Sequence, residues 1–217
     1  ILQKRLIKMA VAKGKHVITA TQMLESMIKN PRPTRAEATD IANAIYDGTT
    51  AIMLSGETAA GMYPIEAVKT MARIAESAEK DIDYRSRMYR FGVDGHTDTT
   101  TAISFATCSV AMDLNAAAII TVTLSGFTAE MVARYKPDCQ IIGCSTQPHV
   151  RRQMNLLYGV KPLTIEDEYS ADVLFVHATE EAKKAGYVKS GDTVVITAGL
   201  PLGVAGKTNM IRVLEVK

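Results

Sequence analysis

The sequence predicts an α/β protein made of two parts. Short apolar runs rich in Val, Ile and Thr alternate with helical patterns of apolar residues, which is typical of parallel βαβ units. Hydrophobic residues make up 47% of the 217 residues and charged residues 22%, as in soluble globular proteins with a sizeable core. A charged stretch, DIDYRSRMYRF at residues 81–91, interrupts the alternation, and we expect it to be a linker helix between domains 1–86 and 87–217.

Charge and composition argue against several classes of function. The formal net charge is +2, so no global field favours nucleic acid or an anionic membrane as a partner. No apolar run reaches the roughly 20 residues that span a bilayer. Cys108, Cys139 and Cys144 lack CxxC spacing, so we expect buried free thiols in a reducing, cytoplasmic compartment. The histidines show no ligand spacing, and no metal site is predicted.

The chain opens inside a helical pattern. Leu2, Leu6, Met9 and Ala10 recur at helical spacing, and Gly14 is suited to cap the end of this helix. No initiator methionine and no N-cap residue precede the pattern, so we expect a fragment of a longer protein. A processed or trimmed natural start is the alternative.

The first strand is predicted over HVITA, residues 16–20, and hydroxyl side chains mark its carboxyl end at Thr19 and Thr21. An apolar face at helical spacing follows within MLESMI, residues 23–28, and predicts a helix. The NPRP turn at residues 30–33 ends that helix.

A capped helix follows the NPRP turn. Thr34 and Glu37 form the T-x-x-E capping box that begins it, and Gly48 is suited to end it. Arg32 and Arg35 flank a proline-stiffened entry to this helix, so their guanidinium groups leave a rigid base at little ordering cost.

The second strand, predicted over AIMLSGE at residues 51–57, again ends in a hydroxyl, Ser55. Because the carboxyl ends of parallel strands lie on one face, we expect Thr21 and Ser55 to lie at equivalent places on it. This arrangement is typical of the catalytic face of a (β/α)8 barrel, although two strands cannot close a barrel. A helix over about residues 65–79 follows. Its predicted buried residues are Ile65, Val68, Met71 and Ala72.

The alternation of strands and helices resumes beyond the linker. Helices are predicted over about residues 98–113, 125–136, 147–159 and 170–188. Strands are predicted over about residues 116–123, 139–146, 160–165, 192–199 and 209–216. These elements predict a compact doubly wound α/β domain of roughly 130 residues, a common domain size.

One loop of this second domain is suited to an anion. Thr123, Ser125 and Thr128 surround Gly126 in the run TVTLSGFTAE, where a strand ends and a helix begins. Hydroxyls, backbone N–H groups and the positive end of a helix dipole are expected to converge there on a phosphate. An ordinary strand-to-helix turn is the alternative.

A second loop, GLPLGVAGKTN, is predicted to face the same ligand. Gly203 and Gly206 permit close backbone approach, and Lys207 and Thr208 follow them with a cation and a hydroxyl.

The first domain resembles pyruvate kinase in four motifs that stand in family order and spacing. They are ATQMLESM, NPRPTRAE, the DG pair before the second strand, and MLSGETA. The remainder, through NMIRVLEV, resembles the C-terminal domain of the same family. The fold that this implies is a partial (β/α)8 barrel, its last two strands and helices, followed by a doubly wound α/β effector-binding domain.

The resemblance implies the glycolytic phosphotransferase reaction, from phosphoenolpyruvate and ADP to pyruvate and ATP, with Mg²⁺ and K⁺. It places Thr21 beside phosphoenolpyruvate and Ser55 in the relay of hydroxyls and water that protonates the enolate. Capping of strand and helix ends is the alternative for both residues. The metal ligands and the lysine that neutralises the phosphoryl group lie on earlier strands of the family's barrel, so we expect the chain alone to be inactive.

The resemblance also implies an allosteric sugar-phosphate site in the two anion loops, and a homotetramer with Arg32 and Arg35 at a subunit interface. Members regulated by fructose 1,6-bisphosphate commonly carry a basic residue where Phe127 stands, so ribose 5-phosphate or AMP stays open as the effector. Ala60 stands where the family often has a lysine near the nucleotide, so no nucleotide-binding residue is assigned. A stand-alone, non-catalytic sugar-phosphate-binding or assembly module, and an unrelated barrel enzyme, are the alternatives.

Overall fold

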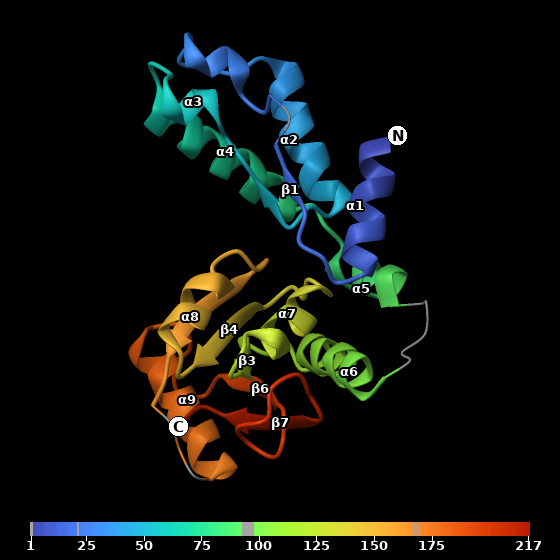
Figure 1. The fold of residues 1–217 in the computed structure, drawn as a ribbon, viewed down its shortest axis with the longest axis vertical. Coiled ribbons are helices and arrows are strands. Elements are labelled where there is room, and N and C mark those ends of the chain that lie inside the picture. The colour runs from blue at the N-terminus through green and yellow to red at the C-terminus, as the bar shows by residue number, and fades with distance from the viewer. Residues whose placement is uncertain (1, 21, 93–97, 167, 169) are drawn as a thin grey trace. The chain divides into compact units, whose positions relative to one another are not determined.

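The computed structural model describes residues 2–20, 22–92, 98–166, 168 and 170–217. Its contacts divide the chain into an N-terminal unit, Ile1–Asp83, and a C-terminal unit, Tyr84–Lys217 (Figure 1). The helix Tyr84–Gly92 (α5) belongs to the C-terminal unit, because Met88 is buried in that unit's core. No helix in the described ranges is both long and apolar enough to cross a membrane.

The N-terminal unit is built on a two-stranded parallel sheet. Ile18–Thr19 (β1) pairs with Ala51–Ile52 (β2), with Ile18 opposite Ala51 and Thr19 opposite Ile52. The other elements are the helices Leu2–Ala12 (α1), Arg35–Asp47 (α2), Gly56–Ala59 (α3) and Pro64–Glu79 (α4), and the 3-10 helix Glu25–Ile28 (η1).

Both strands are shorter than the predicted runs, and threonine hydroxyls make hydrogen bonds around the ladder. The Val17 N–H donates to Thr50 Oγ1 at 3.1 Å, and the Thr19 hydroxyl donates to Thr49 Oγ1 at 2.8 Å. Side-chain hydrogen bonds of this kind offer the backbone an alternative to regular pairing.

The core of the N-terminal unit is formed by Met23, Leu24, Met27, Ile41, Ala44, Ala67 and Met71. The predicted apolar face within residues 23–28 is therefore buried, although it lies on a 3-10 helix and the turn before it. The predicted face of α4 is partly wrong, because Ile65 and Val68 are 63% and 52% exposed. The buried residues of α4, which contacts α2, are Ala67, Thr70, Met71 and Ala78, and Ile74 packs partly against the same core, so Ile65 and Val68 lie on another side.

The predicted helix is present as α1, and only part of its apolar pattern is buried. Ile7 and Val11 are buried, whereas Leu2, Leu6 and Met9 are more than half exposed. The apolar spacing continues around most of this helix, so spacing alone did not decide which side packs against the unit.

The predicted capping box of α2 is confirmed, and it reaches beyond the helix. The Glu37 carboxylate accepts hydrogen bonds from the N–H and the hydroxyl of Thr34 at 2.7 and 2.9 Å. It also accepts from the N–H and the hydroxyl of Ser26 at 2.7 and 2.6 Å, which connects η1 to α2. Burial raises the pKa of Glu37, but the hydrogen bonds from Ser26 and Thr34 outweigh it and hold the pKa below its ordinary value. Gly48 ends α2 in the left-handed conformation, as predicted.

Glu37→Gln should loosen the N-terminal unit, because the amide nitrogen that replaces one carboxylate oxygen cannot accept a hydrogen bond. We expect a loss of about 1–2 kcal/mol, measured as faster amide hydrogen exchange over residues 24–47. Because the folded-state pKa of Glu37 is lowered, the wild-type stabilisation is present above the unfolded-state pKa of about 4.3 and is lost as the pH falls through the folded-state value. Asp40→Asn, at an exposed position of α2, is the control. Equal exchange in the two variants would contradict this role.

The C-terminal unit is a five-stranded sheet in the order β5-β4-β3-β6-β7. Its strands are Ala118–Val122 (β3), Gln140–Ser145 (β4), Val160–Thr164 (β5), Thr193–Ala198 (β6) and Met210–Glu215 (β7). All neighbours are parallel except β6 and β7, which are antiparallel. Every predicted strand of this unit is present, with ends shorter by one or two residues.

Helices cover both faces of this sheet, as the doubly wound prediction requires (Figure 1). One core lies under α5 and the helices Thr99–Asp113 (α6), Phe127–Ala133 (α7) and Pro148–Met154 (α8). The other lies under Ala171–Lys184 (α9), where Leu174, Phe175, Ala178 and Ala182 are buried. The three cysteines are free, with Cys108 and Cys144 buried.

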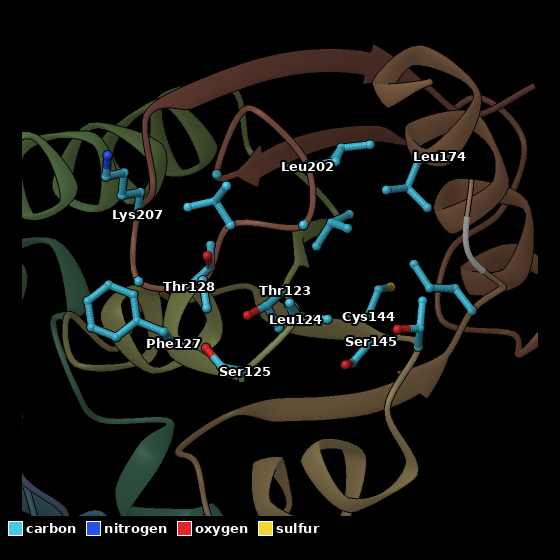
Figure 2. A pocket seen from close by; sticks show the side chains of 18 residues that line it. Thr123, Leu124, Ser125, Phe127, Thr128, Cys144, Ser145, Leu174, Leu202 and Lys207 are labelled. Carbon is cyan, nitrogen blue, oxygen red and sulfur yellow. The ribbon is translucent and has the colours of Figure 1, made fainter. Parts of the chain in front are cut away.

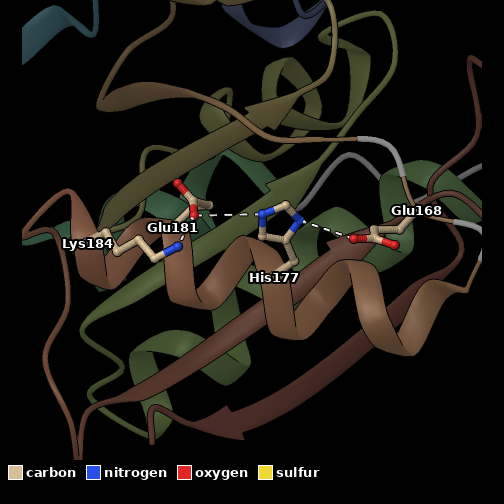
Figure 3. A network of polar contacts seen from close by, with 4 residues as sticks. All are labelled: Glu168, His177, Glu181 and Lys184. Carbon is tan, nitrogen blue, oxygen red and sulfur yellow. Dashed lines mark hydrogen bonds and ion pairs between the residues drawn. The ribbon is translucent and has the colours of Figure 1, made fainter.

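A polar cluster lies where the connection between β5 and α9 meets that helix (Figure 3). His177 Nδ1 is 3.6 Å from Glu168 Oε1, and its Nε2 is 3.7 Å from Glu181 Oε1. Lys184 Nζ donates to Glu181 Oε1 at 2.6 Å. When His177 is protonated, it forms ion pairs that hold the connection on the helix.

Candidate functional site

The C-terminal unit has a pocket of about 100 Å³ beyond the carboxyl ends of β3, β4 and β6 (Figure 2). The chain leaves β3 toward β4 and β5 and then returns to β6 on the other side of β3. This reversal is the topological switch point of the sheet, which is where open α/β sheets bind ligands.

The β3–α7 loop supplies hydroxyls to the pocket. Some of the polar groups of this loop are already hydrogen-bonded within the protein. The Thr123 hydroxyl oxygen accepts a hydrogen bond from the Gly126 N–H at 3.0 Å, so that amide is already used. Gly126 has φ +86°, the left-handed region that favours glycine. The Thr128 hydroxyl is buried against that of Thr208, 3.0 Å away, whereas Ser125 is exposed and can reach a ligand.

The β6–β7 connection, residues 199–209, forms another side of the pocket. Asn209 holds its base, because its amide donates to the Leu200 carbonyl at 2.7 Å and accepts from the Leu200 N–H at 2.8 Å. Gly206 and Lys207 are exposed beyond this base and line the pocket with Gly203. Figure 2 shows Lys207 near Phe127 at the edge of the pocket.

Several lining residues are absent from the set predicted from the sequence. Ser145 ends β4 and Thr146 follows it, and hydroxyls also lie at or after the ends of β1 and β2, so a signal for them existed. Leu174 and Leu202 form an apolar wall across the pocket from Ser125 and Ser145 (Figure 2), and no sequence motif marks them. Burial raises the pKa of Cys144, which also lines the pocket, to about 12, so its thiol is neutral.

The N-terminal unit has a second cavity, of about 280 Å³, at the carboxyl ends of β1 and β2. Its lining residues are Ala20, Gln22, Met23, Glu25, Ile28, Met53, Ser55, Gly56 and Glu57. Ser55 is exposed at the N-cap position of α3, and its side chain makes no capping hydrogen bond. Thr21, the other predicted catalytic residue, lies outside the described residues.

Glu57 is a carboxylate buried at this cavity, with 4% of its surface exposed. It accepts hydrogen bonds from the backbone N–H groups of Leu24 and Ser55, at 3.0 and 2.8 Å. Burial raises the pKa of Glu57, but hydrogen bonds from its own N–H, Ser55 and Leu24 outweigh it and keep the pKa below its ordinary value. The side chain is therefore ionised at neutral pH.

The described residues do not form a site suited to magnesium. In the described ranges, no group of three or more His, Cys, Asp or Glu side chains is placed to hold a metal ion. Both oxygens of Glu57 face backbone amides, and hydroxyls such as that of Ser55 are weak magnesium ligands by themselves. Arg32, within the NPRP turn, and Arg35, the first residue of α2, are both exposed.

The fold is that of an α/β protein with a cavity in each unit, beyond the carboxyl ends of parallel strands that carry hydroxyls. Two family models match the chain in order: "Pyruvate kinase, barrel domain" over residues 1–68 and "Pyruvate kinase, alpha/beta domain" over residues 101–214. The second match covers more than half of the chain, and the chain belongs to the pyruvate kinase family.

Individual relatives agree with this assignment. The chain is 49% identical over 217 residues to a pyruvate kinase of Clostridium acetobutylicum, covering 100% of this chain and 46% of that protein. It is 48% identical to a pyruvate kinase of Sporosarcina psychrophila, covering 98% of this chain and 36% of that protein. A crystal structure of a pyruvate kinase from Cryptosporidium parvum superposes with a TM-score of 0.91 at 38% identity, over 99% of this chain and 43% of that one. The chain thus spans less than half the length of these relatives.

Proposed function

We propose that this chain is part of a pyruvate kinase, which transfers the phosphoryl group of phosphoenolpyruvate to ADP and protonates the resulting enolate to pyruvate. The observation that carries the proposal is the pair of family matches, in order and together covering most of the chain. The N-terminal unit is then the last part of the catalytic barrel, and the C-terminal unit is the effector-binding domain. Pyruvate formation by the full-length protein tests the proposal.

Within this proposal, Thr21 contacts phosphoenolpyruvate and Ser55 belongs to the hydroxyl and water relay that delivers the proton. Support for Ser55 comes from its exposure at the cavity and from the lack of a capping hydrogen bond, which removes the main structural reason for its hydroxyl. A hydroxyl suits a relay because it both donates and accepts. Its own pKa is too high for it to act as a strong acid, so the proton passes through water.

The proposed reaction also requires metal ions, which this chain is not proposed to bind. Mg²⁺ and K⁺ neutralise charge on the transferring phosphoryl group when they are bound. We assign their ligands to the earlier barrel strands of the family and not to this chain. The chain's own contribution is to hold Thr21 and Ser55 at the strand ends.

We further propose that the pocket of the C-terminal unit binds the phosphate of an effector, either a sugar phosphate or a nucleoside monophosphate. The residues assigned to it are Thr123, Ser125, Gly126, Thr128, Gly206, Lys207 and Thr208. Phe127 at the edge of the pocket supplies no charge for a second phosphate, which favours a monophosphate. We also propose a homotetramer with Arg32 and Arg35 at an interface, and a cytoplasmic enzyme, which the free cysteines support.

Ser125→Ala should weaken effector binding by about 10- to 100-fold, the usual range for one hydrogen bond to a charged group. Ser125 is the informative position because its hydroxyl is exposed, whereas that of Thr128 has a structural partner in Thr208. Titration calorimetry with ribose 5-phosphate, AMP and fructose 1,6-bisphosphate measures the effect. Ser190→Ala, an exposed serine far along the chain, is the matched control. If every ligand that binds the wild type binds Ser125→Ala equally well, the phosphate assignment is wrong.

A further inference from the structure

We propose that Glu57 is a positioning residue that sets the separation between residues 22–28, which follow β1, and residues 53–57, which carry Ser55 after β2. The inference rests on the proposed function, because it assigns Glu57 a part in the reaction through other residues. Glu57 itself contacts no reacting atom in the proposed arrangement. Its carboxylate connects the loop after β1 to the loop after β2 through hydrogen bonds and keeps the two loops at a fixed separation.

The hydrogen bonds of Glu57 connect parts of the chain that are far apart in sequence. Its Oε1 accepts from the Leu24 N–H, 33 residues away, and its Oε2 accepts from the Ser55 N–H, two residues away. Leu24 is fully buried three residues after Thr21, and Ser55 is the proposed relay residue. One rigid group thus determines where the main chain of both loops lies.

Close packing makes this connection stiff. A Cβ atom added at Gly56 would lie 3.1 Å from Ile28 Cδ1, so the start of α3 packs against the Ile28 side chain of η1. The Met62 N–H donates to the Ile28 carbonyl at 2.8 Å on the far side of α3. Glu37 fixes Ser26 from another direction, so two carboxylates hold η1 in place.

A direct role for Glu57 in proton transfer or metal binding fits the contacts less well. Both carboxylate oxygens face backbone donors, and the side chain is almost completely buried. A carboxylate that is ionised has no proton to give, and with one amide at each oxygen and 4% of its surface exposed Glu57 presents no open face to a metal. Misplacement of a reacting group by about 1 Å can lower a rate by about 100-fold. A residue that only fixes the positions of the two loops can therefore affect catalysis.

The test compares Glu57→Gln and Glu57→Asp in the full-length protein. Gln keeps the length of the side chain but has one acceptor for two N–H donors, and Asp keeps the charge but is one methylene too short to reach both loops. We expect kcat to fall about 10- to 100-fold in each variant, with KM for phosphoenolpyruvate changed less than threefold. Amide hydrogen exchange at residues 22–28 and 53–57 should accelerate at least tenfold, and exchange in residues 99–215 should not change. Glu66→Gln, an exposed acid on α4, is the control.

The outcomes separate the alternatives. A kcat within twofold of wild type in Glu57→Gln, or unchanged exchange at residues 22–28 and 53–57, overturns the proposal. Loss of one limb of the kcat–pH profile in Glu57→Gln overturns it as well, because that loss indicates direct proton transfer. If the wild-type protein forms no pyruvate, the proposed function fails, while the exchange measurement still decides whether Glu57 holds the two loops. Glu57→Asp serves this comparison if Glu57→Gln does not fold.

Discussion

Gly199→Ala is expected to abolish effector binding and to destabilise the C-terminal unit by about 3 kcal/mol. A Cβ atom at residue 199 would lie 2.0 Å from the carbonyl oxygen of Lys207. That oxygen belongs to the main chain and cannot rotate away, so the β6–β7 connection has to move. The same connection carries Gly206, Lys207 and Thr208, and we expect at least a 100-fold loss of affinity once they are displaced.

Val213→Ala provides the control, because this valine lies on β7, does not line the pocket and is 44% exposed. Denaturant unfolding of the C-terminal unit and calorimetry with the best wild-type ligand measure the two effects. Stability and affinity that are equal in the two variants would contradict the close approach of Gly199 to Lys207.

The 217-residue chain by itself is expected to form no pyruvate above the uncatalysed rate. The reaction requires metal ions and a cationic side chain at the phosphoryl group, and loss of one such preorganised contact commonly costs about 10² to 10³ in rate. Both oxygens of Glu57 accept hydrogen bonds from the backbone N–H groups of Leu24 and Ser55. The hydroxyls of the chain cannot by themselves replace the several contacts that the phosphoryl group requires. The exposed apolar side chains of Leu2, Leu6, Met62 and Ile65 also favour aggregation of the N-terminal unit.

A coupled pyruvate assay on the purified chain, with ADP, magnesium and potassium, tests this expectation. The same preparation should still bind an effector through its C-terminal unit, which shows that the protein is folded. Turnover within tenfold of the full-length enzyme, surviving repurification, would mean that residues of this chain suffice to build the catalytic metal site.

The C-terminal unit was largely predictable because its elements carry strong local signals. Its central strands β3 and β6 are continuous apolar runs, AIITV and TVVITA, that are buried on both faces, and turn residues separate the strands from the helices. The pocket loops were predicted from hydroxyls after a strand. Their hydrogen bonds were not, because the pairing of Thr128 with Thr208 depends on contact across 80 residues.

The N-terminal unit was less predictable from its pattern. The capping box at Thr34 and the terminal Gly48 are local features, and both predictions are confirmed. The buried side of α4 depends instead on its packing against α2, which selects the small Ala67 over the larger Ile65 and Val68. The role of Glu57 also depends on tertiary contacts, since Leu24 is distant in sequence.

A phosphoryl-transfer assay on the full-length protein that contains this chain tests the proposed pyruvate kinase reaction directly. With phosphoenolpyruvate, ADP, magnesium and potassium, we predict that pyruvate and ATP form in equal amounts, and that the effector bound by the C-terminal unit changes the rate. A folded full-length protein that forms neither product at any effector concentration would contradict the proposed function.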